Sequence, residues 1–225
     1  MIELLVFIAI IAVLAGLLLP ALSGAKRRAG VAACRSNLHQ LGLAWEMYLG
    51  DHADRFPDRR DLKNALPGGY KPWVTWPKSD PRSAWAMIVL SNDLAGVEVW
   101  QCPETRRAAW RAPVQVWQAV SAVTNALRTS YWMWRFDRPD DPVPPDVFWG
   151  KTRSQAVSDL DAAGNPQAGR VAGPTEVEFV TDVYFPAASP DVEDEWRGRA
   201  PHRGGRNRLY LDGHAAWWRD ARLHY

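Results

Sequence analysis

The chain lacks the sequence patterns that mark the common classes of enzyme and of nucleic-acid-binding protein. It contains no GxSxG, HExxH or phosphate-binding glycine loop, and no cysteine and histidine arranged as a nucleophile with its base. Its 27 basic and 25 acidic residues are interspersed and leave a net charge of +2, so no basic block can follow a nucleic-acid backbone. We therefore expect neither catalysis nor nucleic-acid binding.

Charge is missing altogether from one stretch near the N-terminus. No residue between Glu3 and Lys26 is charged, and the sequence from Leu4 to Leu22 is apolar apart from one glycine and one proline. At about 1.5 Å per residue, such a run spans roughly 28 Å as a helix, close to the hydrocarbon thickness of a bilayer. Because the run has no polar face, a retained membrane helix fits it better than a buried core helix.

A cleaved secretory signal is the other interpretation of this run. The small residues 23–25 could form a cleavage site, but the run is preceded by Glu3 and by no basic residue, which is the wrong charge for such a signal. The basic residues 26–28 place the rest of the chain in the cytoplasm by the positive-inside rule. Composition alone leaves this location open.

An apolar stripe continues the helical pattern beyond the apolar run. Its members recur every three or four residues, the spacing of one helix face: Val31, Cys34, Leu38, Leu41, Trp45 and Tyr48. No strong helix breaker separates Pro20 from the Gly50-Asp51 pair. We expect one long helix, with residues 1–25 as its membrane half and residues 26–225 as a globular head that includes the amphipathic half.

The remaining sequence predicts an α+β head, with a small antiparallel sheet packed on the stripe. Its clearest element is a hairpin over 207–218, because Asp212-Gly213 stands between alternating apolar runs. We predict further strands at 97–100, 129–136 and 176–185, and short helices at 81–94 (with Ser83 as N-cap) and 114–127. Loops are expected at 50–78, 137–146 and 164–173, and the segment 188–201, acidic and then basic, is expected to be exposed.

The segment MIELLVFIAIIAVLAGLLLPALSGAKRRA resembles the N-terminus of type IV pilins and type II secretion pseudopilins. Glu3 stands at the family's near-invariant acid, and Pro20 stands at its helix-kinking proline. Two further segments resemble a branch that is abundant in planctomycetes and verrucomicrobia. They are CRSNLHQLGLAWEMYLGDHADRFP, from residue 34, and the His-x9-Asp-Gly signature formed by His202 and Asp212-Gly213.

The resemblance implies a structural, non-enzymatic subunit of a pilus or secretion pseudopilus. Such a subunit is a single-pass protein of the bacterial inner membrane, with its head in the periplasm or on the cell surface. Its partners are other copies of itself, related pilins, the prepilin peptidase and the assembly machinery, and Glu3 pairs with a neighbour's terminal amine. The family's basic leader, terminal Gly and Phe have no counterpart before Met1, so N-methylation is implied by the resemblance alone.

The two cysteines of an exported head favour a Cys34–Cys102 disulfide over two buried free thiols. This disulfide closes a loop of about 70 residues and contributes roughly 3–4 kcal/mol in the chain-entropy model.

A structural divalent metal has weaker support, and no other cofactor is expected. A histidine with carboxylates could hold a metal or serve in acid–base work. The candidates are Asp182, His202, Asp212 and His214. We favour structural roles for them, with His202 bonded at the entrance to the hairpin and Asp212 in its turn.

A second group of acids has a spacing that suggests a calcium loop, but it lacks the Gly and the closing Glu of such a loop. A solvated helix end and turn is therefore expected for Asp51, Asp54, Asp58 and Asp61.

The second functional hypothesis is a membrane-anchored module that binds polysaccharide through exposed tryptophans, and the third is a metal-dependent hydrolase around His202 and Asp212. Of the 13 tryptophans, Trp45, Trp85 and Trp100 lie on apolar faces and are expected in the core. Exposed aromatic rings can stack on sugars or contact other subunits. The sequence leaves exposure open for Trp73, Trp76, Trp110, Trp117, Trp132, Trp134, Trp149, Trp217 and Trp218.

Overall fold

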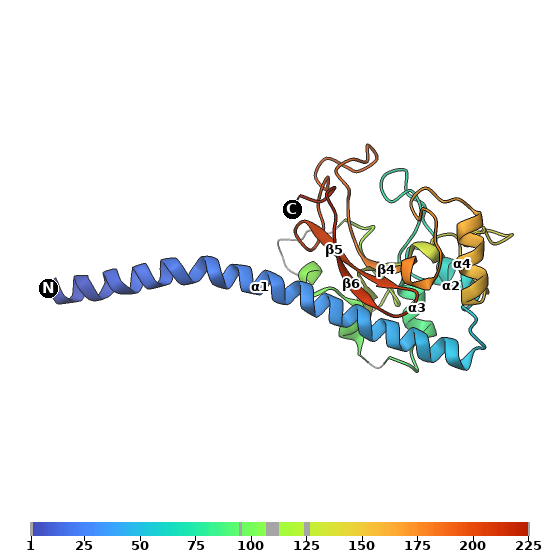
Figure 1. The fold of residues 1–225 in the computed structure, drawn as a ribbon, viewed down its shortest axis with the longest axis horizontal. Helices are drawn as coiled ribbons and strands as arrows, with labels where there is room; N and C mark the ends of the chain where they lie inside the picture. Colours follow the sequence, from blue (N-terminus) through green and yellow to red (C-terminus); the bar gives the residue numbers. More distant parts are fainter. Residues whose placement is uncertain (1, 95, 107–112, 124–126, 225) are drawn as a thin grey trace.

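Helix α1 (Ile2–Asp51) dominates the shape of the computed structural model (Figure 1). Its first half projects away from the head, and its second half lies along the head beside β5 and β6. The single continuous helix predicted from the apolar spacing is confirmed, and the helix continues through Pro20. The structure describes residues 2–94, 96–106, 113–123 and 127–224.

The head combines short helices with antiparallel sheets, so the predicted α+β class is confirmed. Its helices are α2 (Arg60–Ala65), α3 (Ala84–Val89) and α4 (Arg153–Ala162), with 3₁₀ turns η1 (Val97–Trp100), η2 (Pro103–Arg106), η3 (Trp134–Phe136) and η4 (Pro174–Glu176). Its strands are β1 (Gln118–Ala119), β2 (Arg128–Thr129), β3 (Tyr131–Trp132), β4 (Glu178–Asp182), β5 (Gly205–Tyr210) and β6 (Ala215–Arg219). The larger sheet has the order β3-β4-β5-β6, and β1 pairs with β2.

The larger sheet and α1 approach each other closely at the predicted hairpin. A Cβ at Gly42 would lie 2.8 Å from Leu209 Cδ1 and 3.0 Å from the Gly213 carbonyl oxygen, so any larger residue there would push the helix away. Gly213 has φ +85°, the left-handed conformation that a tight turn between β5 and β6 requires. The hairpin predicted from Asp212-Gly213 is therefore confirmed, with Asn207 opposite Trp217.

The predicted stripe of α1 faces the main hydrophobic core. Four of its members are buried and the other two are partly buried: Cys34, Leu38, Leu41 and Trp45, then Val31 and Tyr48. Trp85 and Trp100 are also buried, as predicted. Among the described residues of α1, Gly30 is the first that is buried. The head thus packs on α1 from about the position where the sequence changes from apolar to amphipathic.

Several predictions for the middle of the chain are wrong. Residues 97–100 form the 3₁₀ turn η1 and not a strand, and the expected helix at 114–127 is replaced by the short strand β1 and turns, with 124–126 outside the described residues. The strand expected at 129–136 is divided among β2, β3 and η3. Short apolar runs do not distinguish a strand from a helical turn, because both can bury such residues.

The loops also differ from expectation in two places. The predicted loop 50–78 contains α2, and the segment 188–201, expected to be exposed, buries Val192 and Trp196. Ser83 stands at the N-cap position of α3, but its hydroxyl donates a hydrogen bond to the Tyr131 carbonyl oxygen at 2.7 Å and does not cap the helix. At these sites, contacts with distant parts of the head outweigh the conformation that the local sequence favours.

Helix α2 carries a buried lysine whose ammonium group is held by backbone carbonyl oxygens. Lys63 is 0% exposed, and its Nζ donates hydrogen bonds to the carbonyl oxygens of Asp80 and Arg82 at 2.5 and 2.9 Å. Burial lowers the pKa of Lys63 from 10.5 to about 8, because the charged form loses its hydration. The folded head therefore favours the neutral amine at alkaline pH.

We expect the head to become more stable as pH rises through this range. Between the folded pKa of about 8 and the unfolded value near 10.5, the unfolded chain binds more protons than the folded chain, so the free energy of unfolding increases with pH. The increase from about pH 7.5 to pH 9.5 amounts to roughly 2 kcal/mol. Urea unfolding of the full chain in detergent micelles measures it, and Lys63→Met should abolish it.

The matched control for this titration is Lys71→Met, which changes an exposed lysine. Its free energy of unfolding should rise with pH as much as that of the wild type. An unchanged pH dependence in Lys63→Met would contradict the assignment to the buried amine.

Candidate functional site

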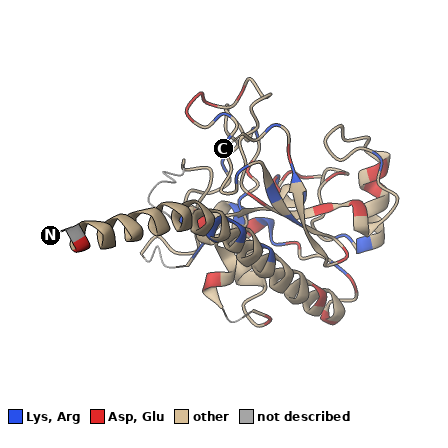
Figure 2. Cartoon of the chain, turned by 60° about the vertical axis from the view of Figure 1, so that its left-hand side comes forward, with Lys and Arg blue, Asp and Glu red and all other residues tan. Residues whose placement is uncertain are grey.

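The first half of α1 presents an apolar surface that nothing in the described chain covers. Every side chain from Leu4 to Leu22 is exposed, and the most apolar window of the helix has a mean hydropathy of 2.9 with 0% of it buried. In Figure 2 the projecting half shows acidic colouring at its tip and no basic colouring until it nears the head, and the sequence has Glu3 as the one charged residue before Lys26. By length and composition, α1 can cross a membrane once.

Both residues predicted to act in assembly lie on this projecting half. Glu3 is exposed in the first turn of α1, where a negative charge interacts favourably with the helix dipole. Pro20 lies inside the helix, and its carbonyl oxygen accepts a hydrogen bond from Ser23 Oγ at 2.8 Å.

The predicted Cys34–Cys102 disulfide is present in the structure. It joins the buried face of α1 to the segment between η1 and η2, with the two Cα atoms 5.2 Å apart and a sequence separation of 68 residues. Both cysteines are 0% exposed. The disulfide therefore ties the long helix to the head at the end of the head nearest to the projecting half.

His202 lies beside this disulfide, which corrects its predicted place at the entrance to the hairpin. Its Nε2 is 3.3 Å from Cys102 Sγ and 3.6 Å from Asp182 Oδ2, and the side chain is buried. Its ring packs edge-on against Trp217 with the ring centroids 6.0 Å apart. The histidine and the Asp-Gly of the His-x9-Asp-Gly signature thus have separate roles, one in the core and the other in the turn.

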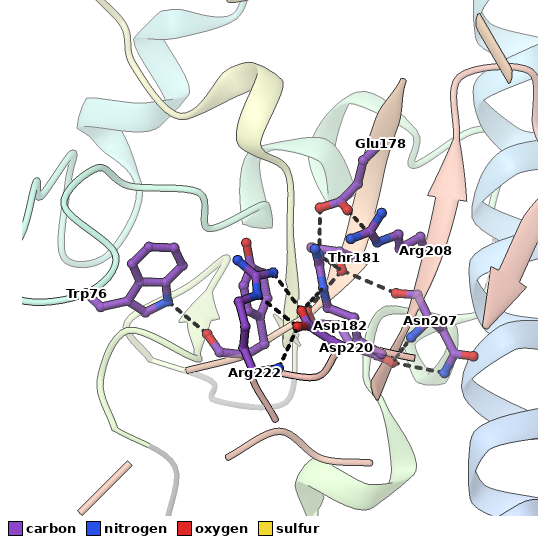
Figure 3. A network of polar contacts seen from close by, with 10 residues as sticks. Trp76, Glu178, Thr181, Asp182, Asn207, Arg208, Asp220 and Arg222 are labelled. Atoms are coloured by element: carbon purple, nitrogen blue, oxygen red, sulfur yellow. Dashed lines mark hydrogen bonds and ion pairs between the residues drawn. The ribbon is translucent and has the colours of Figure 1, made fainter. Parts of the chain in front are cut away.

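Asp182, at the end of β4, completes this group of buried polar side chains. Its Oδ2 accepts hydrogen bonds from the backbone N and the Nδ2 of Asn207 at 2.8 and 2.9 Å (Figure 3). Within the described ranges, its Oδ1 is buried without a hydrogen-bond partner. Burial raises the pKa of the Asp182 carboxyl, and His202 and Asn207 oppose this effect only in part.

We call Cys34, Cys102, Asp182 and His202 the Cys–Asp–His cluster. One ligand atom from each of the four lies within 4.8 Å of those of the other three, and all four residues are buried. These are the donor types that zinc uses in proteins. Two of the predicted metal candidates are therefore brought together, in the company of the cysteines.

The other two metal candidates lie elsewhere, in the hairpin turn. Asp212 and His214 are exposed, and Asp212 Oδ1 lies 2.5 Å from His214 Nδ1. The His214 ring also stacks on Tyr210, with the centroids 4.3 Å apart. These contacts stabilise the turn. Asp212 therefore lies at the surface, whereas His202 is buried, although the hydrolase hypothesis requires the two residues to lie side by side.

Three of the four acids considered for a calcium loop form ion pairs with arginines. Asp54, Asp58 and Asp61 pair with Arg153, Arg60 and Arg59, at 2.6, 2.6 and 2.9 Å. Asp51 is exposed at the end of α1. These contacts agree with the predicted solvated helix end and turn.

A cavity beside the sheet combines arginine and aromatic side chains, and the sequence patterns did not indicate it. The cavity has a volume of about 510 Å³ and is lined in part by Trp76, Trp134, Trp218, Arg206, Arg208 and Arg222. Arg208 Cζ lies 3.6 Å from the Trp218 ring centroid, and Arg208 pairs with Glu178 at 2.7 Å (Figure 3). We call this cavity the Arg–Trp pocket.

Exposure of the tryptophans is limited. Trp218, 36% exposed, is the most open of the tryptophans in the described ranges. Trp132 and Trp149 are buried, Trp110 lies outside the described residues, and the partly buried ones are Trp73, Trp76, Trp117, Trp134 and Trp217. A sugar would therefore meet partly exposed tryptophans that line the Arg–Trp pocket and not a row of fully exposed rings.

The chain matches no protein-family model, no curated protein and no solved structure. Three features of the described chain bear on its function: the exposed apolar half of α1, the Cys–Asp–His cluster and the Arg–Trp pocket.

Proposed function

We propose that this protein is a structural, pilin-like subunit that assembles through α1 into a type IV pilus or a secretion pseudopilus. The observation that carries the proposal is the exposed apolar half of α1, joined without interruption to a half that is packed into a folded head. Such a helix needs an apolar environment over its whole circumference. A bilayer supplies it before assembly, and the same half of neighbouring subunits supplies it afterwards.

The length and position of the apolar half support both states. The run from Leu4 to Leu22 spans roughly 28 Å, enough for one bilayer crossing. It projects well beyond the head, so several copies can bring these halves together with their heads outside (Figure 1). The proposed location is the bacterial inner membrane, with the head in the periplasm or on the cell surface and no catalytic role.

Glu3 is the residue to which we assign specific pairing between subunits. It is the one charged residue before Lys26, and a carboxylate at the end of an apolar helix is costly unless it is hydrated or paired. A terminal amine of a neighbouring copy neutralises it in the filament. The resemblance to pilins supports this role, and by the same resemblance the prepilin peptidase and the assembly machinery are proposed partners.

The alternative function is a membrane-anchored module that binds polysaccharide, and the Arg–Trp pocket favours it. Its guanidinium groups can pair with carboxylates, and its indole rings can pack against the faces of sugars. An acidic polysaccharide is therefore the ligand class that the pocket fits. In this case the apolar half of α1 serves only as an anchor.

Replacing Glu3 by alanine is expected to abolish filaments while the protein remains in the membrane. Loss of a charge-assisted pair costs roughly 1.5–3 kcal/mol, so assembly falls by at least about tenfold. Electron microscopy of cells that produce the chain measures filaments, and immunoblotting of the membrane fraction measures the subunit.

Glu195→Ala is the matched control, because it removes an exposed acid from the head. Filaments should be unchanged in this variant. Abundant filaments in Glu3→Ala would contradict the role of Glu3, and absence of filaments from the wild type would contradict assembly altogether. Binding of an acidic polysaccharide by the full chain in micelles, without filaments, would favour the alternative.

A further inference from the structure

The Cys–Asp–His cluster has the donor set of a structural metal site. Thiolate sulfur, imidazole nitrogen and a carboxylate oxygen together are typical of zinc, whereas magnesium and calcium prefer oxygen ligands. Cys34, Cys102, Asp182 and His202 are each at most 3% exposed, so no open coordination position faces solvent. Structural zinc sites are closed in the same way.

The distances within the cluster are close to those that tetrahedral zinc requires. With bonds of about 2.3 Å to sulfur and 2.0–2.2 Å to nitrogen and oxygen, neighbouring ligand atoms lie roughly 3.3–3.8 Å apart. His202 Nε2 lies 3.3 Å from Cys102 Sγ and 3.6 Å from Asp182 Oδ2. The cysteine Cα atoms are 5.2 Å apart, so rotation of the side chains can separate the two sulfurs once their bond is broken.

The surroundings of Asp182 also suit a cation. Asn207 donates two hydrogen bonds to Oδ2 and fixes the carboxylate plane, as residues around metal ligands commonly do. The buried Oδ1 has no hydrogen-bond partner in the described part of the chain, although an unpaired buried carboxylate oxygen is costly. A metal ion beside this carboxylate would offset that cost.

We propose that the reduced chain binds one Zn²⁺ through Cys34, Cys102, Asp182 and His202, so that the cluster holds either a disulfide or a metal ion. The two states are linked by balanced steps. A dithiol reductant gives two electrons and two protons to the disulfide and is itself oxidised to a disulfide. Zn²⁺ then displaces both thiol protons to solvent and binds the two thiolates.

The consequence is that α1 stays joined to the head in either redox state. In the oxidised chain the covalent bond makes the connection. In the reduced chain the metal makes it between Cys34 on α1 and the three ligands of the head. Zinc would therefore protect the folded subunit before its disulfide forms, independently of whether the subunit later enters a filament.

The test uses the full chain, reduced with a phosphine, refolded into detergent micelles without oxidant and supplied with Zn²⁺ or with Co²⁺ as a spectroscopic probe. We expect one bound metal per chain by elemental analysis and a Co²⁺ spectrum with thiolate charge-transfer and tetrahedral bands. The oxidised chain should bind neither ion, because disulfide sulfurs are not thiolates. Stoichiometric binding by the oxidised chain, or a Co²⁺ spectrum without thiolate bands, would overturn the proposal.

Ligand variants assign the site to its four residues. Asp182→Asn and His202→Ala should each weaken Co²⁺ binding by at least about tenfold, since even residues behind the ligands contribute tenfold or more. The control variant Asp212→Asn, in the exposed Asp212–His214 pair, should bind Co²⁺ as the wild type does. The site is refuted if the first two variants bind normally or the control variant loses binding.

Where a ligand variant folds poorly, the effect of Zn²⁺ on the free energy of unfolding tests the site instead. Zn²⁺ should raise the urea midpoint of the reduced wild type and should leave unchanged that of the Cys34→Ala/Cys102→Ala double variant, which can form neither a disulfide nor the site. An equal rise in both chains, or no rise in the wild type, counts against zinc binding at the cluster.

Discussion

Trp45→Ala is expected to lower the free energy of unfolding of the head by about 3–5 kcal/mol, the usual cost of truncating a buried tryptophan. Trp45 is 2% exposed and lies on the face of α1 that is packed against the head. Its ring meets five other aromatic rings at centroid distances of 5.3–6.2 Å: Tyr48, Phe56, Trp85, Phe136 and Phe179. The loss should therefore weaken the attachment of α1 to the head as well as the core.

Two measurements check this expectation in detergent micelles. Urea unfolding gives the change in stability, and hydrogen exchange should show faster opening of the amphipathic half of α1. Leu43→Ala is the matched control, because Leu43 lies on the same helix and is 53% exposed. Its effect should stay within about 0.5 kcal/mol. A similar loss in both variants would contradict the assignment of the effect to the buried aromatic contacts of Trp45.

The second large effect is expected at Arg206, a buried cation on β5. Its Nη1 donates hydrogen bonds to Glu178 Oε1 at 2.7 Å and to Thr181 Oγ1 at 2.8 Å, and its Nε lies 3.6 Å from Asp220 Oδ2. Its Cζ also lies 3.9 Å from the Tyr184 ring centroid. Arg206→Met removes the buried one of the two arginines that pair with each carboxylate, since Arg208 stays beside Glu178 and Arg222 beside Asp220. The variant should cost about 3 kcal/mol near neutral pH.

The pH dependence distinguishes this mechanism from a simple loss of packing. Burial raises the pKa of Glu178, but Arg206 and Arg208 lower it by more, so the folded pKa lies below the ordinary value of 4.5. The stabilisation is therefore present above pH 4.5 and is lost as pH falls through the folded pKa. The difference between the wild type and Arg206→Met should shrink in acid, and a difference that is independent of pH would contradict the mechanism.

Arg197→Met is the control for the loss of an ion pair. Arg197 Nη2 lies 3.0 Å from Asp194 Oδ1, with side-chain exposures of 42% and 91%. Exposed pairs of this kind contribute about 0–1 kcal/mol, so the urea midpoint should hardly change. Acid should leave the small difference between this variant and the wild type nearly unaltered.

Local signals predicted those elements whose cause is local. The spacing from Val31 to Tyr48 predicted the amphipathic half of α1, and Asp212-Gly213 predicted the turn between β5 and β6. Helix α4 carries a comparable signal that the predictions did not use. Thr152 and Gln155 form a reciprocal capping box, which marks a helix start within the sequence itself.

The predictions were wrong for segments whose local sequence is not sufficient to determine their conformation. Residues 97–100 contain alternating valines and read as a strand, yet they form η1 beside α1 and next to the disulfide. Residues 188–201 are rich in charge and read as exposed, yet Trp196 packs against Phe185 with ring centroids 5.7 Å apart. In both segments, contacts with distant parts of the chain outweigh the local pattern.

The sequence by itself determined that this protein has one long apolar-to-amphipathic helix, an α+β head and a hairpin at Asp212-Gly213, because helix periodicity and turn chemistry act over a few residues. Only the tertiary structure decided which polar residues meet. Cys102 and His202 are 100 positions apart, and their contact exists because β4, β5 and α1 pack around one buried volume. The same packing placed Asp182 there and left Asp212 outside, since a strand continues into the core whereas a turn must return to solvent.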